Sequence, residues 1–338
     1  MRKVTIKDVA KEAGVSFKTV SRVINKEGSV KAATLEKVTA AIKTLNYQPN
    51  AAARSLAGTK SYVIGFVYDN PNAYYVVDMQ KGILAECQAQ GYELLIHPCQ
   101  FSSPNIKTEL VELVTKSKLS GLILAPPISE SSEILQALDE ANIPYSRIIA
   151  GNTMSDSKQV TIMVDDYHSA QTLTEHLIEL GHKDIAFFCG EFHHQSTPER
   201  LNGYRHALKS SGLAINENNI FEGKYSFNSG AENARKLLKL KQRPTAIVAC
   251  NDEIAAGALF ALRLEGVNIP DDISIVGFEN SPFSQQTWPE LTTMDQPTAQ
   301  IAQTSTQLLI ENLKGNGTTL TKVFEPMPIY RGSSAKAS

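Results

Sequence analysis

The fold of the N-terminal part is decided by the stretch Thr5-Ile-Lys-Asp-Val-Ala-Lys-Glu-Ala-Gly-Val-Ser-Phe-Lys-Thr-Val-Ser-Arg-Val-Ile-Asn25. It begins as a helix, because Thr5 is a good N-cap and Asp8 places an acid over the free amides of the first turn. Gly14 tolerates a left-handed backbone and ends that helix. Ser16 then caps a second short helix. The stretch therefore predicts two helices joined by a tight turn.

A third helix is expected over residues 32–45. Its apolar residues recur at helical spacing, and we expect Leu35, Val38, Ile42 and Leu45 to be buried against the first two helices. Lys31, just before this helix, is a poorer cap than a Ser would be. Two short helices, a Gly-containing turn and a bracing third helix indicate a helix-turn-helix module.

The second helix carries side chains suited to reading DNA. Its apolar positions leave four residues facing outward, namely Phe17, Lys18, Ser21 and Arg22. In such a module these positions reach base edges in the major groove, where Arg22 can present two donors to guanine and Phe17 an apolar contact to thymine. Side chains suited to phosphate contacts are those of Thr5, Ser16, Thr19, Asn25 and Thr34. The alternative is a three-helix bundle whose polar face is only solvated.

Charge is distributed unevenly along the chain. Residues 1–60 hold twelve Lys and Arg against four acids, whereas the whole chain has a net charge of −2. The body that follows is therefore acidic. A basic end on an acidic body favours a polyanion-binding module attached to a domain with another task.

These residues resemble the opening of the Lac repressor/galactose repressor family, and Leu45-Asn-Tyr-Gln-Pro-Asn-Ala-Ala-Ala-Arg-Ser-Leu-Ala57 resembles that family's hinge. The resemblance implies a helix that forms on DNA, since so short a helix is marginal alone. It also implies that Leu56 wedges into the minor groove, with Asn50 and Ala53 nearby. The alternative is an Ala-rich linker. We expect a headpiece at residues 1–48 and a hinge at 49–60.

From Tyr62 onward, short apolar runs alternate with helical segments, which predicts parallel sheets covered on both faces. The runs are expected at 62–68, 94–96, 121–124, 146–149, 161–164, 185–188, 246–249 and 274–277. The family resemblance implies a two-lobed α/β core over 61–338, like periplasmic sugar-binding proteins, with three crossovers. We expect lobe one at about 61–158 and 292–319, and lobe two at about 159–291 and 320–338.

A ligand is expected between the lobes, outside the carboxyl ends of the strands. Candidate effector-binding residues, chosen by residue type and by the resemblance, are Tyr74, Tyr75, Arg200, Tyr225, Asn251, Glu279 and Gln296. Structural alternatives are half-buried packing for Tyr74 and Tyr75, a cap or an acid bridge within its own helix for Arg200, and a helix cap for Asn251. Glu279 stands where the family usually has an Asp, so the pocket is expected to differ there.

The sequence carries no phosphate-binding loop, nucleophile elbow or metalloprotease motif, and no Cys-x-x-Cys. His193 and His194 are adjacent, which favours effector contact or a surface position over a metal site, so no metal and no cofactor is expected. No signal peptide or membrane span is visible, and the cysteines indicate a reducing cytoplasm.

The sequence therefore predicts a cytoplasmic DNA-binding regulator, a repressor of a carbohydrate-utilisation operon, and not an enzyme. Its expected partners are double-stranded operator DNA, a small effector that is a sugar or sugar phosphate, and a second copy of the chain. A homodimer is expected because the polar end of the chain has no apolar heptads. The alternatives are a nucleoside or purine effector, a solute receptor for a transporter, and an α/β enzyme with a fused DNA-binding domain.

Overall fold

The computed structural model describes residues 4–24, 30–45, 47, 61–70, 72–151, 159–317 and 320–337. The chain divides into two compact units, Met1–Tyr62 and Val63–Ser338. The expected contacts of Asn25, Asn50, Ala53 and Leu56 lie outside the described residues.

The first unit has the helix-turn-helix arrangement expected from its sequence. It consists of α1 (Ile6–Ala13), α2 (Phe17–Ile24) and α3 (Ala32–Thr44). One carboxylate oxygen of Asp8 accepts from the Thr5 backbone N–H at 2.8 Å and from the Thr5 hydroxyl at 2.7 Å, which fixes the start of α1. Gly14 has a φ of 66° and turns the chain toward α2.

The core of this unit is apolar and small. Val9, Val20 and Val38, one from each helix, are fully buried in it. The expectation that Leu35 is buried was wrong, because its side chain is 46% exposed. Leu35 lies in the first turn of α3, whereas the buried stripe begins one turn later at Val38 and continues with Ala41. Lys31 makes no side-chain cap bond to α3, as its residue type led us to expect.

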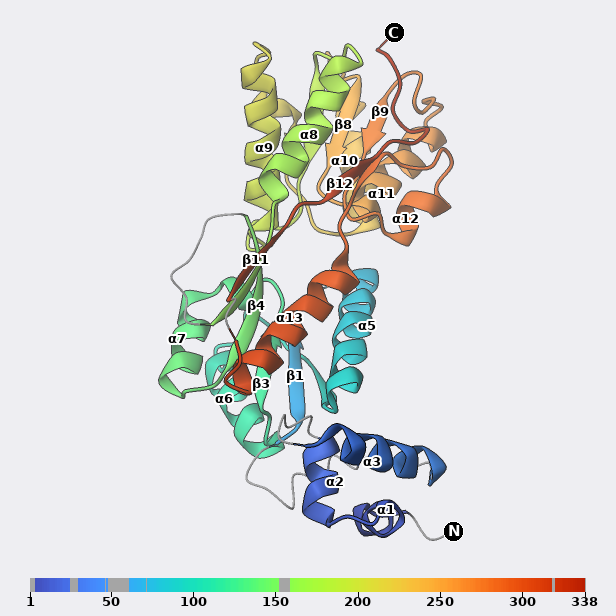
Figure 1. Ribbon diagram of the computed structural model, residues 1–338. Helices are drawn as coiled ribbons and strands as arrows, with labels where there is room; N and C mark the ends of the chain where they lie inside the picture. The colour runs from blue at the N-terminus through green and yellow to red at the C-terminus, as the bar shows by residue number, and fades with distance from the viewer. Residues whose placement is uncertain are drawn as a thin grey trace. The chain divides into compact units, whose positions relative to one another are not determined.

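The second unit is built on two parallel sheets (Figure 1). The first has the strand order β11-β5-β4-β3-β1-β2. Its strands are β1 (Val63–Tyr68), β2 (Glu93–Pro98), β3 (Gly121–Leu124), β4 (Tyr145–Ala150), β5 (Val160–Val164) and β11 (Thr321–Phe324). All pairings in this sheet are parallel, which agrees with the apolar runs of its inner strands β1, β3 and β5.

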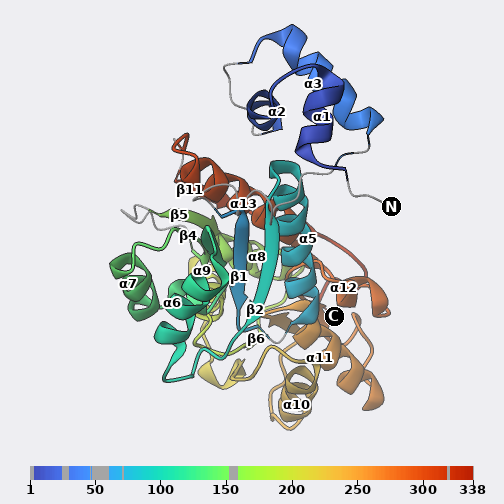
Figure 2. The same ribbon diagram turned by 90° about the horizontal axis from the view of Figure 1, so that it is seen from below.

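Helices cover both faces of the first sheet. α5 (Ala73–Gln90) and α13 (Thr298–Leu313) lie side by side on one face, as both views show, and α6 (Ile106–Ser117) and α7 (Ser132–Glu140) cover the other (Figures 1 and 2). α5 and α13 approach closely at Gly82, where an added Cβ would lie 2.0 Å from the Ala299 carbonyl oxygen. Any larger residue at position 82 would push these two helices apart.

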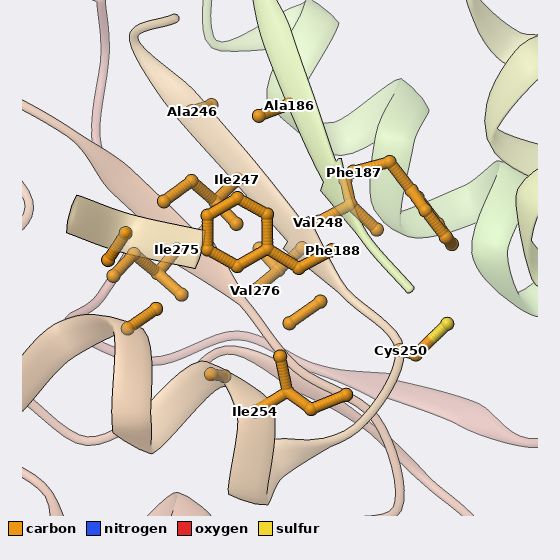
Figure 3. Packing of buried hydrophobic residues seen from close by; sticks show 14 of the residues in the cluster. Ala186, Phe187, Phe188, Ala246, Ile247, Val248, Cys250, Ile254, Ile275 and Val276 are labelled. Carbon is orange, nitrogen blue, oxygen red and sulfur yellow. The ribbon is translucent and has the colours of Figure 1, made fainter. Parts of the chain in front are cut away.

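The second sheet has the order β7-β6-β8-β9 and forms the centre of the other lobe. Its strands are β6 (Ile185–Phe188), β7 (Ile220–Phe221), β8 (Ala246–Ala249) and β9 (Ser274–Val276). The helix pairs around it are α8 (Asp166–Glu179) with α9 (Ser196–Ser210), and α10 (Phe227–Leu237) with α11 (Asp252–Leu264). Figure 3 shows its core, in which Phe188, Ile247, Val248 and Ile275 pack together.

The chain passes between the lobes at places that differ from the expected boundaries. Residues 159–164 were expected in lobe two, but β5 pairs with β4 and β11 in the first sheet. Residues 320–338 were also expected in lobe two, but residues 321–324 form β11 of the first sheet. An apolar run alone does not specify which sheet it joins, because that is decided by hydrogen-bond partners.

The crossovers therefore lie at the ends of short strands. The first follows β5 at Asp165, and the third runs from β11 to β12 (Met327–Ile329). β12 pairs antiparallel with β10 (Thr293–Asp295), which is bridged to Glu279 at the edge of lobe two. The second crossover thus lies between β10 and α13, and residues 292–295 belong with lobe two rather than with lobe one.

Candidate functional site

The exposed face of α2 has the composition expected of a DNA-contacting surface. Phe17 is 61% exposed, and Lys18 and Arg22 are exposed beside it, whereas Val20 and Val23 are buried. Ser16 Oγ accepts from the Thr19 backbone N–H at 3.1 Å, and the two hydroxyls lie 2.9 Å apart. A large exposed aromatic ring within a basic helix is unusual unless the surface binds something. Of the other predicted contacts in this unit, Thr5 is exposed, and Ser21 and Thr34 are half-buried.

The second candidate site is a cavity of about 60 Å³ between the two lobes. The predicted residues that line it are Tyr75, Arg200, Tyr225, Asn251, Glu279 and Gln296. Tyr74 is absent from the lining; its ring is 37% exposed and meets the ring of Phe283 edge-on at 5.5 Å. Six of the seven predicted positions are thus brought together by the fold.

Arg200 is the buried cation of the cavity. It lies on α9, donates from Nε to Asp166 Oδ1 at 2.7 Å, and also donates to the Cys250 carbonyl oxygen. Its guanidinium carbon lies 3.5 Å from the centroid of the Phe278 ring. Burial acts to lower the pKa of Arg200, but Asp166 outweighs it and raises the pKa, so the guanidinium stays charged. The alternative of an intrahelical bridge is wrong for this partner, because Asp166 lies on α8.

Tyr225 supplies a flat aromatic wall. Its hydroxyl lies 3.0 Å from the Ser196 hydroxyl and 2.8 Å from the Thr197 hydroxyl, so it is held by the start of α9. An added Cβ at Gly190 would lie 2.3 Å from the Tyr225 ring, so the ring needs a glycine there. Because the Tyr225 hydroxyl already contacts the Ser196 and Thr197 hydroxyls, the aromatic ring is the part of Tyr225 left to contact a ligand.

Asn251 combines a structural role with an unsatisfied donor. Its Oδ1 accepts from the Ile254 backbone N–H at 2.9 Å and caps α11. Its Nδ2 is buried at the cavity without a hydrogen-bond partner. A buried amide donor without a partner costs on the order of 1–3 kcal/mol, which a ligand acceptor would offset. A helix-capping role for Asn251 was the alternative to ligand binding in the sequence analysis. In the structure its Oδ1 atom caps α11, while its Nδ2 atom is left to bind a ligand.

Glu279 joins the two lobes. It follows β9 with a φ of 101°, and its Oε2 accepts from Asn72 Nδ2 of lobe one at 2.8 Å. Burial raises the pKa of Glu279 to about 8, although Arg200 acts in the opposite direction. The residue that stands in place of the family's usual Asp therefore contacts the opposite lobe directly.

Other contacts cross the same seam. The carboxylate of Glu130, after β3, accepts from the Gln195 backbone N–H at 3.1 Å and from the Ala150 backbone N–H at 3.0 Å. Burial raises its pKa to about 7. Phe101 of lobe one stacks on His193 of lobe two, with ring centroids 6.1 Å apart.

The two adjacent histidines differ in burial, although their ring centroids lie only 4.6 Å apart. His193 is exposed, while His194 is buried and lines the cavity. Burial lowers the pKa of His194 to about 4, so its ring is neutral. In the described part of the chain, no group of three or more His, Cys, Asp or Glu is placed to hold a metal ion. Among those same residues, no helix is both long and apolar enough to cross a membrane.

Sequence reasoning missed several polar residues of the cavity, namely Asn70, Asn72, Asp166, Ser196 and Thr298. Asn70 and Asn72 follow β1 by two and four residues, and Asp166 follows β5 by two residues. Polar residues after the carboxyl end of a parallel strand are the signal that could have found them.

Comparison with known proteins matches two parts of the chain to domain families. Residues 5–50 match the family described as bacterial regulatory proteins, lacI family, and residues 174–334 match a periplasmic binding protein-like domain. The HTH-type transcriptional repressor PurR of Vibrio campbellii is 31% identical, with 96% of each chain covered. The chain belongs to the lacI family of bacterial regulatory proteins. The HTH-type transcriptional regulator DegA of Bacillus subtilis is 34% identical over 87% of each chain.

Solved structures of the lacI family have the same architecture. The lac repressor dimer bound to operator and the anti-inducer ONPF superimposes with a TM-score of 0.76 at 30% identity, covering 99% of this chain and all of that one. A complex of the regulator CelR with cellobiose superimposes with a TM-score of 0.74 at 27% identity, covering 98% of this chain and 100% of that one. A lacI-type headpiece and a two-lobed binding core are therefore joined in one chain.

Proposed function

We propose that the protein is a transcriptional repressor that binds operator DNA through its headpiece and senses a small molecule in the interlobe cavity. The observation that carries the proposal is the unsatisfied Nδ2 of Asn251 at a cavity whose other walls come from both lobes. A ligand that contacts both lobes favours one interlobe arrangement over others, and only such differential binding can shift an equilibrium.

The cavity lies beside the crossovers, which supports coupling to the headpiece. Asp166 is one residue beyond the first crossover at Asp165, and Gln296 and Thr298 flank the second. A change in lobe arrangement pivots at these points. The hinge at residues 49–60, with Leu56 as a minor-groove wedge beside Asn50 and Ala53, would respond by forming or losing its helix on DNA.

Base reading is assigned to the α2 surface. Arg22, Lys18 and Phe17 would contact base edges, with Ser21 beside them. Phosphate contacts would come from Thr5, Ser16, Thr19, Asn25 and Thr34. The basic headpiece on an acidic body supports this assignment, since the excess of Lys and Arg over acids lies in residues 1–60, the part proposed to meet DNA.

A homodimer is proposed as the active form, because operator half-sites need two headpieces. Large apolar side chains exposed on the second unit support a dimer. They are those of Val77 and Leu84 on α5, Phe260 and Leu264 on α11, and Trp288 after α12 (Pro282–Gln286). Such side chains gathered on helices favour a protein interface over a solvated face. The lac repressor of known structure is described as a dimer on operator.

The effector is proposed to be a sugar-like molecule that acts on a carbohydrate operon. Hydroxyl groups both donate and accept, so a polyol satisfies the Asn251 donor and the Asp166 and Glu279 carboxyl groups together, while the Tyr225 ring faces the sugar ring. A purine or nucleoside is the second candidate. It is favoured by the relatives named as PurR repressors and by the two tyrosine rings, Tyr75 and Tyr225, in the lining.

Operator binding with the full chain tests the proposal. DNA selected from a random library should yield a pseudo-palindrome, and its affinity should shift when monosaccharides, disaccharides, nucleosides or purine bases are added. Removing Arg22 should weaken selection of the common site while leaving the fold of the core intact. Failure to select any common sequence would refute the proposed repressor.

A further inference from the structure

His194 is a buried imidazole whose ring nitrogens have no partner within the fold. Its side chain is 5% exposed and lines the interlobe cavity together with Arg200 and Tyr225. The backbone of His194 is fully used, since its N–H donates to the Glu191 carbonyl oxygen at 3.2 Å and its carbonyl oxygen accepts from the Thr197 N–H at 2.9 Å. Within the described ranges of the chain, neither ring nitrogen makes a hydrogen bond. Buried polar groups normally have a partner, so this ring is an exception.

His182, in the same lobe, is a buried histidine that the fold does satisfy. It is 3% exposed, and its Nδ1 lies 2.8 Å from the Thr245 hydroxyl. Its Nε2 lies 3.1 Å from the Ser274 hydroxyl and 3.0 Å from the Ala335 carbonyl oxygen. A carbonyl oxygen only accepts, so Nε2 carries the proton and Nδ1 accepts from Thr245. The two histidines are almost equally buried, and the difference between them is the supply of partners.

The surroundings of His194 keep its ring uncharged. Burial lowers the pKa of His194 to about 4, and His193 and Arg200 act in the same direction, while Asp69 opposes them. A neutral imidazole has one N–H donor and one acceptor nitrogen. A hydroxyl group complements either nitrogen, because it both donates and accepts. An uncharged polar ligand group is therefore the natural partner of this ring.

Neighbouring rings fix the plane of the His194 side chain. Its ring meets the Tyr225 ring at an interplanar angle of 80°, with centroids 5.5 Å apart. The His193 ring lies 4.6 Å from it, and His193 in turn stacks on Phe101 of lobe one at 6.1 Å. The ring is thus ordered by packing before any ligand binds, which lowers the entropic cost of a contact made through it.

We propose that His194 contacts the effector directly and selects a ligand with a hydroxyl group, through a hydrogen bond to its imidazole ring. The inference rests on the proposed function and adds a contact from the loop before α9 to the unsatisfied donor of Asn251. The sequence gave both adjacent histidines the same two alternatives, effector contact or surface. The inference assigns the effector contact to His194 and the surface position to His193.

Comparison of His194→Phe with His182→Phe, in the full chain without effector, tests whether the fold itself uses the His194 ring. Phenylalanine keeps a flat ring and removes both nitrogens. Replacing an unpaired buried polar group by an apolar one of similar shape is nearly neutral or stabilising, so His194→Phe should melt at or above the wild-type temperature. His182→Phe should melt at a lower temperature, because Thr245, Ser274 and Ala335 lose their partner. A melting temperature of His194→Phe that falls as far as that of His182→Phe overturns the inference.

Ligand titrations measure the contact itself. Calorimetry with the full chain would use D-glucose, D-galactose, D-ribose and adenosine, each of which carries hydroxyl groups. For a probe that the wild type binds, His194→Phe should bind at least about 10-fold more weakly. His194→Gln, which keeps a donor and an acceptor, should recover part of that loss. A probe that binds His194→Phe as tightly as the wild type overturns the inference.

The melting comparison decides the matter when no probe in the panel binds, since it needs no ligand. Failure to select an operator would refute the proposed repressor and leave both of these results unchanged. The inference and the proposed function therefore fail by different measurements.

Discussion

Asn72 donates from Nδ2 to Glu279 Oε2 over 2.8 Å, so the start of α5 in one lobe is bonded directly to the end of β9 in the other. The same Asn72 side chain accepts at Oδ1 from the backbone N–H groups of Tyr74 and Tyr75, at 3.1 and 3.2 Å. The helix cap thus fixes the orientation of the amide that reaches across the seam. A local feature of one helix sets an interlobe contact.

Asn72→Asp should weaken this seam without removing the cap. The carboxylate still accepts from the Tyr74 and Tyr75 amides, but its second oxygen now faces Glu279, which is also a carboxylate once the pH lies well above its pKa of about 8. We expect a loss of about 1–3 kcal/mol in the free energy of unfolding of the core, measured by urea titration at pH 10, where both groups are ionised.

Adding Glu279→Gln to Asn72→Asp should restore most of that stability, because the new amide can donate to the carboxylate. The two changes should therefore be strongly non-additive in a double-mutant cycle. Additive effects would mean that the two side chains do not interact in solution.

Arg200→Ala should leave Asp166 buried and unpaired. Breaking a buried ion pair by removing one partner costs about 3–5 kcal/mol, so the core should lose much of its stability as well as its effector response. The double variant Arg200→Ala with Asp166→Asn removes the stranded charge and should be more stable than the single variant. Effector binding should stay lost in both, since the guanidinium that positions the cavity wall is gone. Retained binding in the double variant would contradict the role of Arg200.

Parts of this site could be predicted from sequence because the residue types and their neighbours are distinctive. Arg200 and Asn251 lie directly after strand-like runs or within recognisable motifs, and both line the cavity. Asn72 and Asp166 were missed, because their roles depend on which strand ends meet across the seam. The assignment of β5 to the first sheet also depends on long-range pairing. Tyr74 was expected in the cavity, but the phase of α5 directs Tyr75 there and leaves Tyr74 against Phe283.

Arg22→Ala should reduce specific operator binding with no effect on the core. The loss of a bidentate base contact costs about 1–3 kcal/mol of discrimination, which fluorescence anisotropy with selected and scrambled DNA would measure. Lys43→Ala removes the same charge from α3, at an exposed position of the same unit, and is the matched control. Lys43→Ala should weaken binding to the selected DNA and to the scrambled DNA equally. Equal losses on both DNAs for Arg22→Ala would show that it contacts phosphate and not bases.

The apolar surface of α11 should be required for the dimer. Phe260 is 48% exposed and Leu264, one turn later, is 66% exposed, and both line a groove with Phe283 and Phe227. Phe260→Glu would place a charge in this surface, so burying it in an interface becomes unfavourable. Light scattering after size exclusion should show a monomer that keeps its thermal transition, and operator affinity should fall because two half-sites are no longer bound together.

Ile96→Glu, at a 44% exposed apolar residue on the edge strand β2, is the control and should stay dimeric. If Phe260→Glu remains a dimer while Ile96→Glu dissociates, the interface lies along the edge of the first sheet and not on α11.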